Sequence, residues 1–175
     1  MRNGSERAHA PRAAEPSSVV VIGLGNALRH DDAAGLEIAR RLRAGRQNAG
    51  IAVYEHEGET LALLDIWQSA RAAVLVDTIR SGAPPGTIQR FDATSAPIPA
   101  QLQSSCSTHA FGLAEAIELA RALHRLPERV VLIGIEGRRF DAGLGLSEEV
   151  RAMVGRLLED VSSEARQLAG EPGAA

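Results

Sequence analysis

Apolar runs of strand length alternate along the chain with segments in which apolar residues recur every three or four positions. Continuous apolar runs occur at 18–23, 72–77 and 129–137, which is typical of strands buried on both faces of a sheet. A further run at 51–56 has the β-branched and aromatic residues of a strand. The helical spacing predicts helices over 32–45, 60–70, 109–126 and 146–168.

The segment 87–92 departs from this alternation. It has strand character, but only the residues 78–86 separate it from the strand before it. Such a connection is too short for the crossover helix that a parallel neighbour requires. We therefore expect this strand to lie antiparallel at an edge. The pattern as a whole predicts an α/β fold, a three-layer αβα sandwich around a mostly parallel, twisted, five-stranded sheet with one antiparallel edge strand.

The length of 175 residues suits one hydrophobic core of ordinary size. We expect a disordered leader at 1–17, a single α/β domain at 18–168 and a disordered tail at 169–175. The leader lacks the apolar stretch of a signal peptide. No apolar run approaches the roughly 20 residues that cross a bilayer, so no membrane association is expected.

Composition narrows the classes of partner and the compartment. Hydrophobic residues make up 45% of the chain and charged residues 23%, which is typical of a globular protein. The net charge of -3 argues against a nucleic-acid partner, because phosphate binding needs a basic surface. Cys106 is the only cysteine, so an intramolecular disulfide is impossible and a reducing, cytoplasmic location is expected.

The segment 19–42 begins like a dinucleotide-binding strand and turn, with Gly23 and Gly25 in place. The third glycine of that fingerprint is missing, because Leu28 occupies its position. Asp31 and Asp32 would also face the phosphates, and like charges at a helix N-terminus disfavour binding. Nucleotide binding is therefore disfavoured.

Two other interpretations of the aspartates remain open. One aspartate could be the N-cap of the following helix, a contribution of about 1 kcal/mol, which leaves the second unexplained. Alternatively, Asp32 helps to hold a cation with Asp77, which ends another predicted strand at the same edge of the sheet. An imidazole suits zinc, nickel or copper as a third ligand. His109 opens a predicted helix within reach of that edge, although taken alone it is more simply a surface histidine.

In combination these segments resemble the hydrogenase maturation proteases, which remove a C-terminal peptide from the large subunit of nickel-iron hydrogenases. The resemblance runs from Val19 to about Leu158 and is most specific in "GLGNALRHDDAAG". Three further segments follow in the order of the family: "VLVDTI", "STHAFGL", and "VVLIGIEG" followed by "GLGLS".

The resemblance implies that Asp32, Asp77 and His109 bind metal and carry the catalysis. Asn26, Asp31 and Gly58 would support the site or bind substrate: Asp31 as the helix cap that positions its neighbour, Asn26 by bracing the turn or the peptide. The implied cofactor is nickel supplied by the substrate, with other divalent ions able to replace it in vitro. The implied partner is the large-subunit precursor. We expect the protein itself to be a monomer.

The chain departs from the pattern of the family at three positions. Ala33 stands where the family often has glycine, and the segment around Gly58 matches the family's glycine-rich segment only loosely. Asp32 stands where the acidic ligand is often glutamate. These differences bear on the choice of substrate more than on the fold.

Two rival functions remain open. A non-catalytic nickel-binding assembly factor would keep the three ligands but hydrolyse no peptide bond. Thiol catalysis would use Cys106, three residues before His109, as the nucleophile; a small buried cysteine without a chemical role is the simpler interpretation of Cys106.

Overall fold

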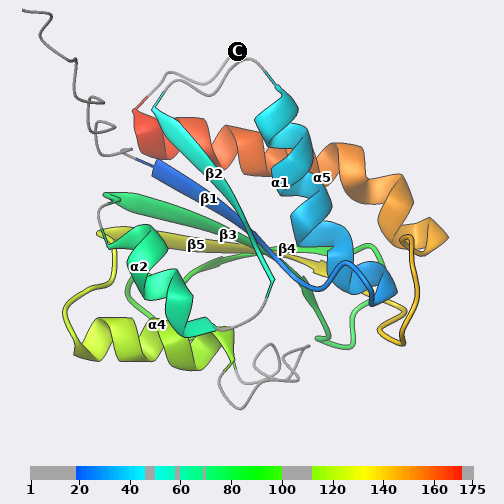
Figure 1. Ribbon diagram of the computed structural model, residues 1–175, viewed down its shortest axis with the longest axis horizontal. Coiled ribbons are helices and arrows are strands. Elements are labelled where there is room, and N and C mark those ends of the chain that lie inside the picture. The colour runs from blue at the N-terminus through cyan, green and yellow to red at the C-terminus, as the bar shows by residue number, and fades with distance from the viewer. Residues whose placement is uncertain (1–18, 46–49, 58–59, 69, 100–111, 171–175) are drawn as a thin grey trace, which may run out of the picture.

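A computed structural model describes residues 19–45, 50–57, 60–68, 70–99 and 112–170 (Figure 1). Its strands form one five-stranded sheet in the order β2-β1-β3-β5-β4. Four strands are parallel and β4 pairs antiparallel with β5 at the edge, as the sequence predicts. The bounds are β1 Val19–Leu24, β2 Ile51–His56, β3 Ala72–Ile79, β4 Ile88–Asp92 and β5 Arg129–Glu136.

Helices cover both faces of the sheet. Figure 1 shows α1 (Ala34–Ala44) and α5 (Glu148–Ala169) on one face, and α2 (Leu63–Trp67) and α4 (Leu113–Ala122) on the other. The three-layer prediction is confirmed. Among the described residues, none of the helices has the length and apolar character needed to span a membrane.

Side chains that alternate along each strand build two cores. In β3, Leu75 and Ile79 pack toward α2 and α4 around the buried Trp67, whereas Val74 and Val76 pack toward α1 and α5. Alternation sends successive residues to opposite faces. Asp77 follows the parity of Leu75 and Ile79, so its side chain leaves the sheet on the face covered by α2 and α4.

Two short helical segments differ from the sequence-based prediction. The predicted helix 32–45 is split into a 3-10 helix, η1 (His30–Ala33), and α1, whose N-cap is Ala33 with no side-chain hydrogen bond. The interpretation of Asp31 as the cap of this helix is therefore wrong. The predicted helix 60–70 is likewise shorter, because η2 (Thr60–Ala62) precedes α2.

Helix α1 lies unusually close to the sheet, and two glycines make this possible. A Cβ atom on Gly23 would lie 2.1 Å from the carbonyl oxygen of Gly35. A Cβ atom on Gly35 would lie 2.3 Å from the carbonyl oxygens of both Leu24 and Val76. The start of α1 therefore rests on the backbones of β1 and β3, which places η1 directly above the carboxyl ends of these two strands.

Candidate active site

Asp32 and Asp77 come together at the carboxyl edge of the sheet. Strands β1 and β3 are parallel neighbours, with Gly23 opposite Val76. Asp77 is the next residue of β3 after this pair, toward the carboxyl edge of the sheet. The side chain of Asp32 is buried, and its negative charge acts on Asp77. The structure thus brings together two of the three ligands that the family resemblance implies.

The environment of Asp77 disfavours its ionised form. Burial, with a further contribution from the charge of Asp32, raises the pKa of Asp77 to about 7. The N–H of Thr78, which donates to Asp77 Oδ1 at 2.7 Å, opposes this shift. Two carboxylates in such a place repel each other when both are ionised. A proton or a divalent cation relieves that repulsion, so the pair is suited to bind either.

Asp31 binds the loop between β5 and α5 at the carboxyl edge of the sheet. Its Oδ2 accepts the backbone N–H groups of Arg138 at 2.9 Å and Arg139 at 2.8 Å, and its Oδ1 accepts that of Ser147 at 2.6 Å. Its own carbonyl oxygen accepts the Thr78 hydroxyl at 2.6 Å. Asp31 therefore connects the elements on either side of Asp32 and fixes the position of its neighbour.

The charge of Asp31 suits this role. Burial by itself would raise the pKa of Asp31, but the backbone N–H groups of Ser147, Arg139 and Arg138 together hold the pKa below its ordinary value. Ser147 is the N-cap residue of α5, whose N-terminus favours a negative charge. Asp31 thus stays ionised, whereas Asp77 binds a proton more readily.

Asn26 closes the turn that carries Asp32. Its Oδ1 accepts the N–H of Leu28 at 2.9 Å, and its backbone N–H donates to the carbonyl oxygen of Asp32 at 3.2 Å. Gly25 lies beside the same carbonyl, with φ +143° and room for no Cβ atom, since that atom would lie 1.7 Å from the oxygen. Gly25 and Asn26 therefore fix the conformation of the turn that carries Asp32.

We expect Gly25→Ala to lower the free energy of unfolding by about 2 kcal/mol, because alanine strains this backbone conformation and collides with the Asp32 carbonyl. Peptidase activity should fall with it, since the turn positions Asp32. Urea denaturation measures the change. Gly155→Ala is the matched control: that glycine lies within α5 with nothing near its Cβ position, so stability should rise slightly. Equal stability of the two variants would contradict this view of Gly25.

His109, Gly58 and Cys106 lie outside the described residues, so the predictions about them stand as predictions. Among the residues that the structure does describe, no group of three or more histidine, cysteine or acidic side chains could hold a metal ion. The acidic pair therefore makes up the described part of the candidate site.

Sequence reasoning missed the backbone partners of Asp31 and the hydroxyl of Thr78. The threonine follows Asp77 directly in "VLVDTI", and this adjacency was the available signal. The N–H donors of Arg138, Arg139 and Ser147 lie more than a hundred residues away from Asp31 in the chain. A sequence pattern carries no sign of such contacts.

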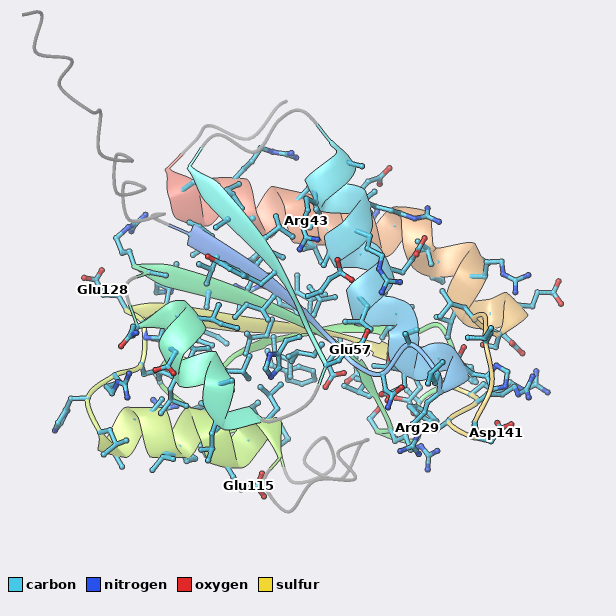
Figure 2. The ribbon with its side chains drawn as sticks, in the orientation of Figure 1. Arg29, Arg43, Glu57, Glu115, Glu128 and Asp141 are labelled. Carbon is cyan, nitrogen blue, oxygen red and sulfur yellow. The ribbon has the colours of Figure 1, made fainter. Side chains whose placement is uncertain are left out.

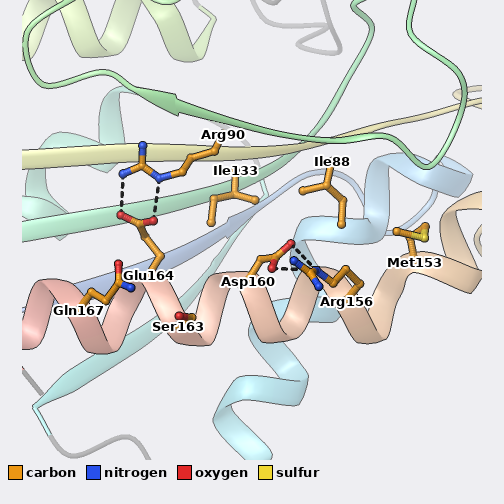
Figure 3. Close-up of a pocket in the computed structure, with 9 residues that line it drawn as sticks. All are labelled: Ile88, Arg90, Ile133, Met153, Arg156, Asp160, Ser163, Glu164 and Gln167. Carbon is orange, nitrogen blue, oxygen red and sulfur yellow. Dashed lines mark hydrogen bonds and ion pairs between the residues drawn. The ribbon is translucent and has the colours of Figure 1, made fainter. Parts of the chain in front are cut away.

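A groove of about 520 Å³ lies elsewhere, between β4 and α5 (Figure 3). Its charged side chains pair with one another: Arg90 with Glu164, and Arg156 with Asp160. None of the predicted site residues lines it. The chemistry of the chain therefore points to the carboxyl edge of the sheet and not to this groove.

Comparisons with known proteins show which family the chain resembles. The family model described as "Hydrogenase maturation protease" matches residues 38–164. The hydrogenase 2 maturation protease of Escherichia coli is 28% identical over 152 residues, which cover 85% of this chain and 91% of that protein. The hydrogenase expression/formation protein HoxM of Cupriavidus necator is 29% identical over 157 residues, 88% of this chain and 77% of the relative.

A solved structure extends the likeness to three dimensions. The hydrogenase maturating endopeptidase HybD from Escherichia coli superposes with a TM-score of 0.74 and 25% sequence identity, over 87% of this chain and 93% of that one. The family match spans more than half of the chain, and the shared fold covers most of both chains. The chain therefore belongs to the hydrogenase maturation protease family and is an endopeptidase.

Proposed function

We propose that this endopeptidase removes the C-terminal extension from the precursor of a nickel-iron hydrogenase large subunit, and that it recognises the nickel already placed in that precursor. Asp32, Asp77 and His109 are the proposed ligands, with two carboxylate oxygens and one imidazole nitrogen. The observation that carries this proposal is the meeting of Asp32 and Asp77 at the carboxyl edge of the sheet.

The acidic pair fits a divalent cation. Each carboxylate supplies one negative charge, so the two balance a 2+ ion and lose their mutual repulsion when it binds. A precursor without nickel offers no such relief, and its docking would leave two repelling carboxylates against a protein surface. The nickel of the substrate thus acts as a checkpoint that permits cleavage only after the metal has been inserted.

Cleavage also needs a water molecule and a group that takes its proton. A carboxylate of the pair can serve as this base, because it lies where the metal-bearing part of the precursor would dock. The nickel of the substrate would supply Lewis acidity when bound. Asp31, held by three backbone N–H groups, keeps the turn that carries Asp32 in place throughout.

The test is the intact mass of the precursor after incubation with the protein. Nickel-loaded precursor should lose the mass of its C-terminal extension, while nickel-free precursor should keep its full mass. Asp32→Asn and His109→Ala should reduce the rate of cleavage at least about 100-fold. Asp65→Asn is the matched control, because that carboxylate is exposed and remote from the site.

Three outcomes would count against the proposal. Equal cleavage of both precursors would remove the checkpoint, and undiminished cleavage by both site variants would remove the proposed ligands. Nickel binding without any change in the mass of the precursor would favour a non-catalytic assembly factor. Loss of activity on thiol alkylation, but not with a chelator, would point to Cys106.

We also propose that the protein acts as a monomer in the cytoplasm. Its single cysteine has no partner within the chain for a disulfide, so it gains nothing from an oxidising compartment. Light scattering of the free protein gives its mass, and a doubled mass would contradict the monomer.

A further inference from the structure

Two leucines at the edge of the candidate site are the most exposed large hydrophobic side chains among the described residues. Leu28 is 66% exposed and Leu144 is 74% exposed. Single exposed leucines are ordinary on protein surfaces. These two, however, lie on segments that are distant in the chain but pair with each other in the fold.

Backbone hydrogen bonds join the two segments that carry the leucines. The N–H of Gly143 donates to the carbonyl oxygen of Leu28 at 2.8 Å, and the N–H of His30 donates to the carbonyl oxygen of Gly143 at 2.9 Å. Leu144 follows Gly143 directly. The turn after β1 and the loop before α5 therefore run in parallel here, with one leucine on each.

Further hydrogen bonds hold the backbones of both segments in place. Arg29 donates from Nε and Nη2 to the carbonyl oxygen of Phe140 at 3.1 and 2.9 Å. The Nδ1 atom of His30 lies 3.0 Å from the carbonyl oxygen of Gly145. The surroundings of Arg29 and Asp141 appear in Figure 2. A rigid surface that is ordered before binding loses little entropy when a partner docks.

Leu28 belongs to the same turn as Asp32, and Leu144 lies on the segment that pairs with this turn. The backbone N–H of Asp32 donates to the carbonyl oxygen of Arg29 at 3.1 Å, and Leu28 precedes Arg29. A stable protein interface buries about 800 Å² on each partner, which corresponds to a disc of radius roughly 16 Å. An interface of this size around Asp32 would therefore extend to the adjoining turn with Leu28 and to the paired segment with Leu144.

We propose that Leu28 and Leu144 form a docking surface for an apolar patch on the hydrogenase large-subunit precursor, next to the metal that Asp32 binds. This inference rests on the proposed function. The two leucines select the protein partner, and the acidic pair separately recognises nickel.

The size and surroundings of the pair favour a transient partner over a second copy of this chain. Two leucine side chains supply far less than the roughly 1,000 Å² that a stable interface needs in total. Exposed charged side chains of Arg139 and Asp141 lie beside them, which is typical of the polar rim around a small apolar contact. An enzyme that must release its product after each cleavage needs such a limited surface.

The test compares Leu28→Ser, Leu144→Ser and the double variant with Leu123→Ser. Leu123 is the matched control, because it is 51% exposed but lies at the C-cap of α4, away from the site. With nickel-loaded precursor, each single variant should raise KM about tenfold through lost apolar contact, and the double variant more. The kcat should stay within about twofold, and the control should match the wild type.

Binding of Ni²⁺ to the free variants and their melting temperatures should equal those of the wild type, which excludes damage to Asp32. If the wild type cleaves no precursor, the proposed function fails, while binding of the precursor to the same variants still tests the docking surface. The inference is overturned if KM and precursor binding respond no more than in Leu123→Ser. A fall in kcat alone, or a dimer that the double variant dissociates, would overturn it as well.

Discussion

Asp77→Asn is expected to reduce cleavage at least about 100-fold and, at about pH 8, to raise the melting temperature. The loss of activity follows from the removal of a ligand and candidate base. The gain in stability follows first from the burial of an ionised carboxylate and second from its repulsion by Asp32. Asparagine carries no charge but keeps the oxygen that accepts the Thr78 N–H. Active sites often contain such locally unfavourable groups at the expense of stability.

The gain in stability of Asp77→Asn should increase with pH. The pKa of Asp77 is about 7 in the folded protein and 3.8 in its ordinary environment. A group with a raised folded pKa contributes stability that is complete below about pH 3.8 and is lost as the pH rises through about 7. One unit corresponds to about 1.4 kcal/mol, which sets an upper limit of about 4 kcal/mol. Since Asp77 keeps some contact with solvent, about 1–3 kcal/mol is expected.

Thermal unfolding at about pH 8 and about pH 4 tests this directly, since the variant should gain a few degrees at the higher pH and almost nothing at the lower one. Asp65→Asn, whose carboxylate is exposed, should differ little from the wild type at either pH. A variant of Asp77 that is less stable at about pH 8 would show that the acidic pair is not under repulsion.

Asp31→Asn should act in the opposite direction and destabilise the protein by about 2–4 kcal/mol at neutral pH. The amide replaces one acceptor oxygen with a donor, and this donor faces backbone N–H groups that the carboxylate now satisfies. Each buried N–H left without an acceptor costs about 1–3 kcal/mol. The loop between β5 and α5 should then loosen, so activity should fall together with stability.

Urea denaturation at about pH 7 and about pH 3 measures this effect. The pKa of Asp31 is held below its ordinary value, so its contribution is present above about pH 3.8 and is lost as the pH falls through the folded pKa. The difference between wild type and variant should therefore shrink in acid. Asp141→Asn changes an exposed carboxylate on the same loop and should leave stability nearly unchanged. If Asp141→Asn destabilises the protein as much as Asp31→Asn does, the hydrogen bonds of the buried Asp31 carboxylate have no special role.

Much of the fold could be predicted because it depends on local pattern. Continuous apolar runs marked β1, β3 and β5, and the short connection 78–86 placed β4 antiparallel at the edge. The start of α1 was predicted less well. Asp31 has the residue type of a helix cap, but its carboxylate binds backbone groups of another segment, and tertiary contacts override such local preferences.

The sequence by itself determined the layers of the fold, the presence of one acidic residue shortly after the first strand and another near the carboxyl end of the third, and the resemblance to a peptidase family. These follow from residue order, because side-chain periodicity and connection length restrict the topology. Only the tertiary structure decided that Asp32 acts on Asp77, that Asp31 binds the loop before α5, and that Leu28 and Leu144 lie together. Such contacts depend on distances between segments far apart in the chain, and these distances exist only once the backbone has folded.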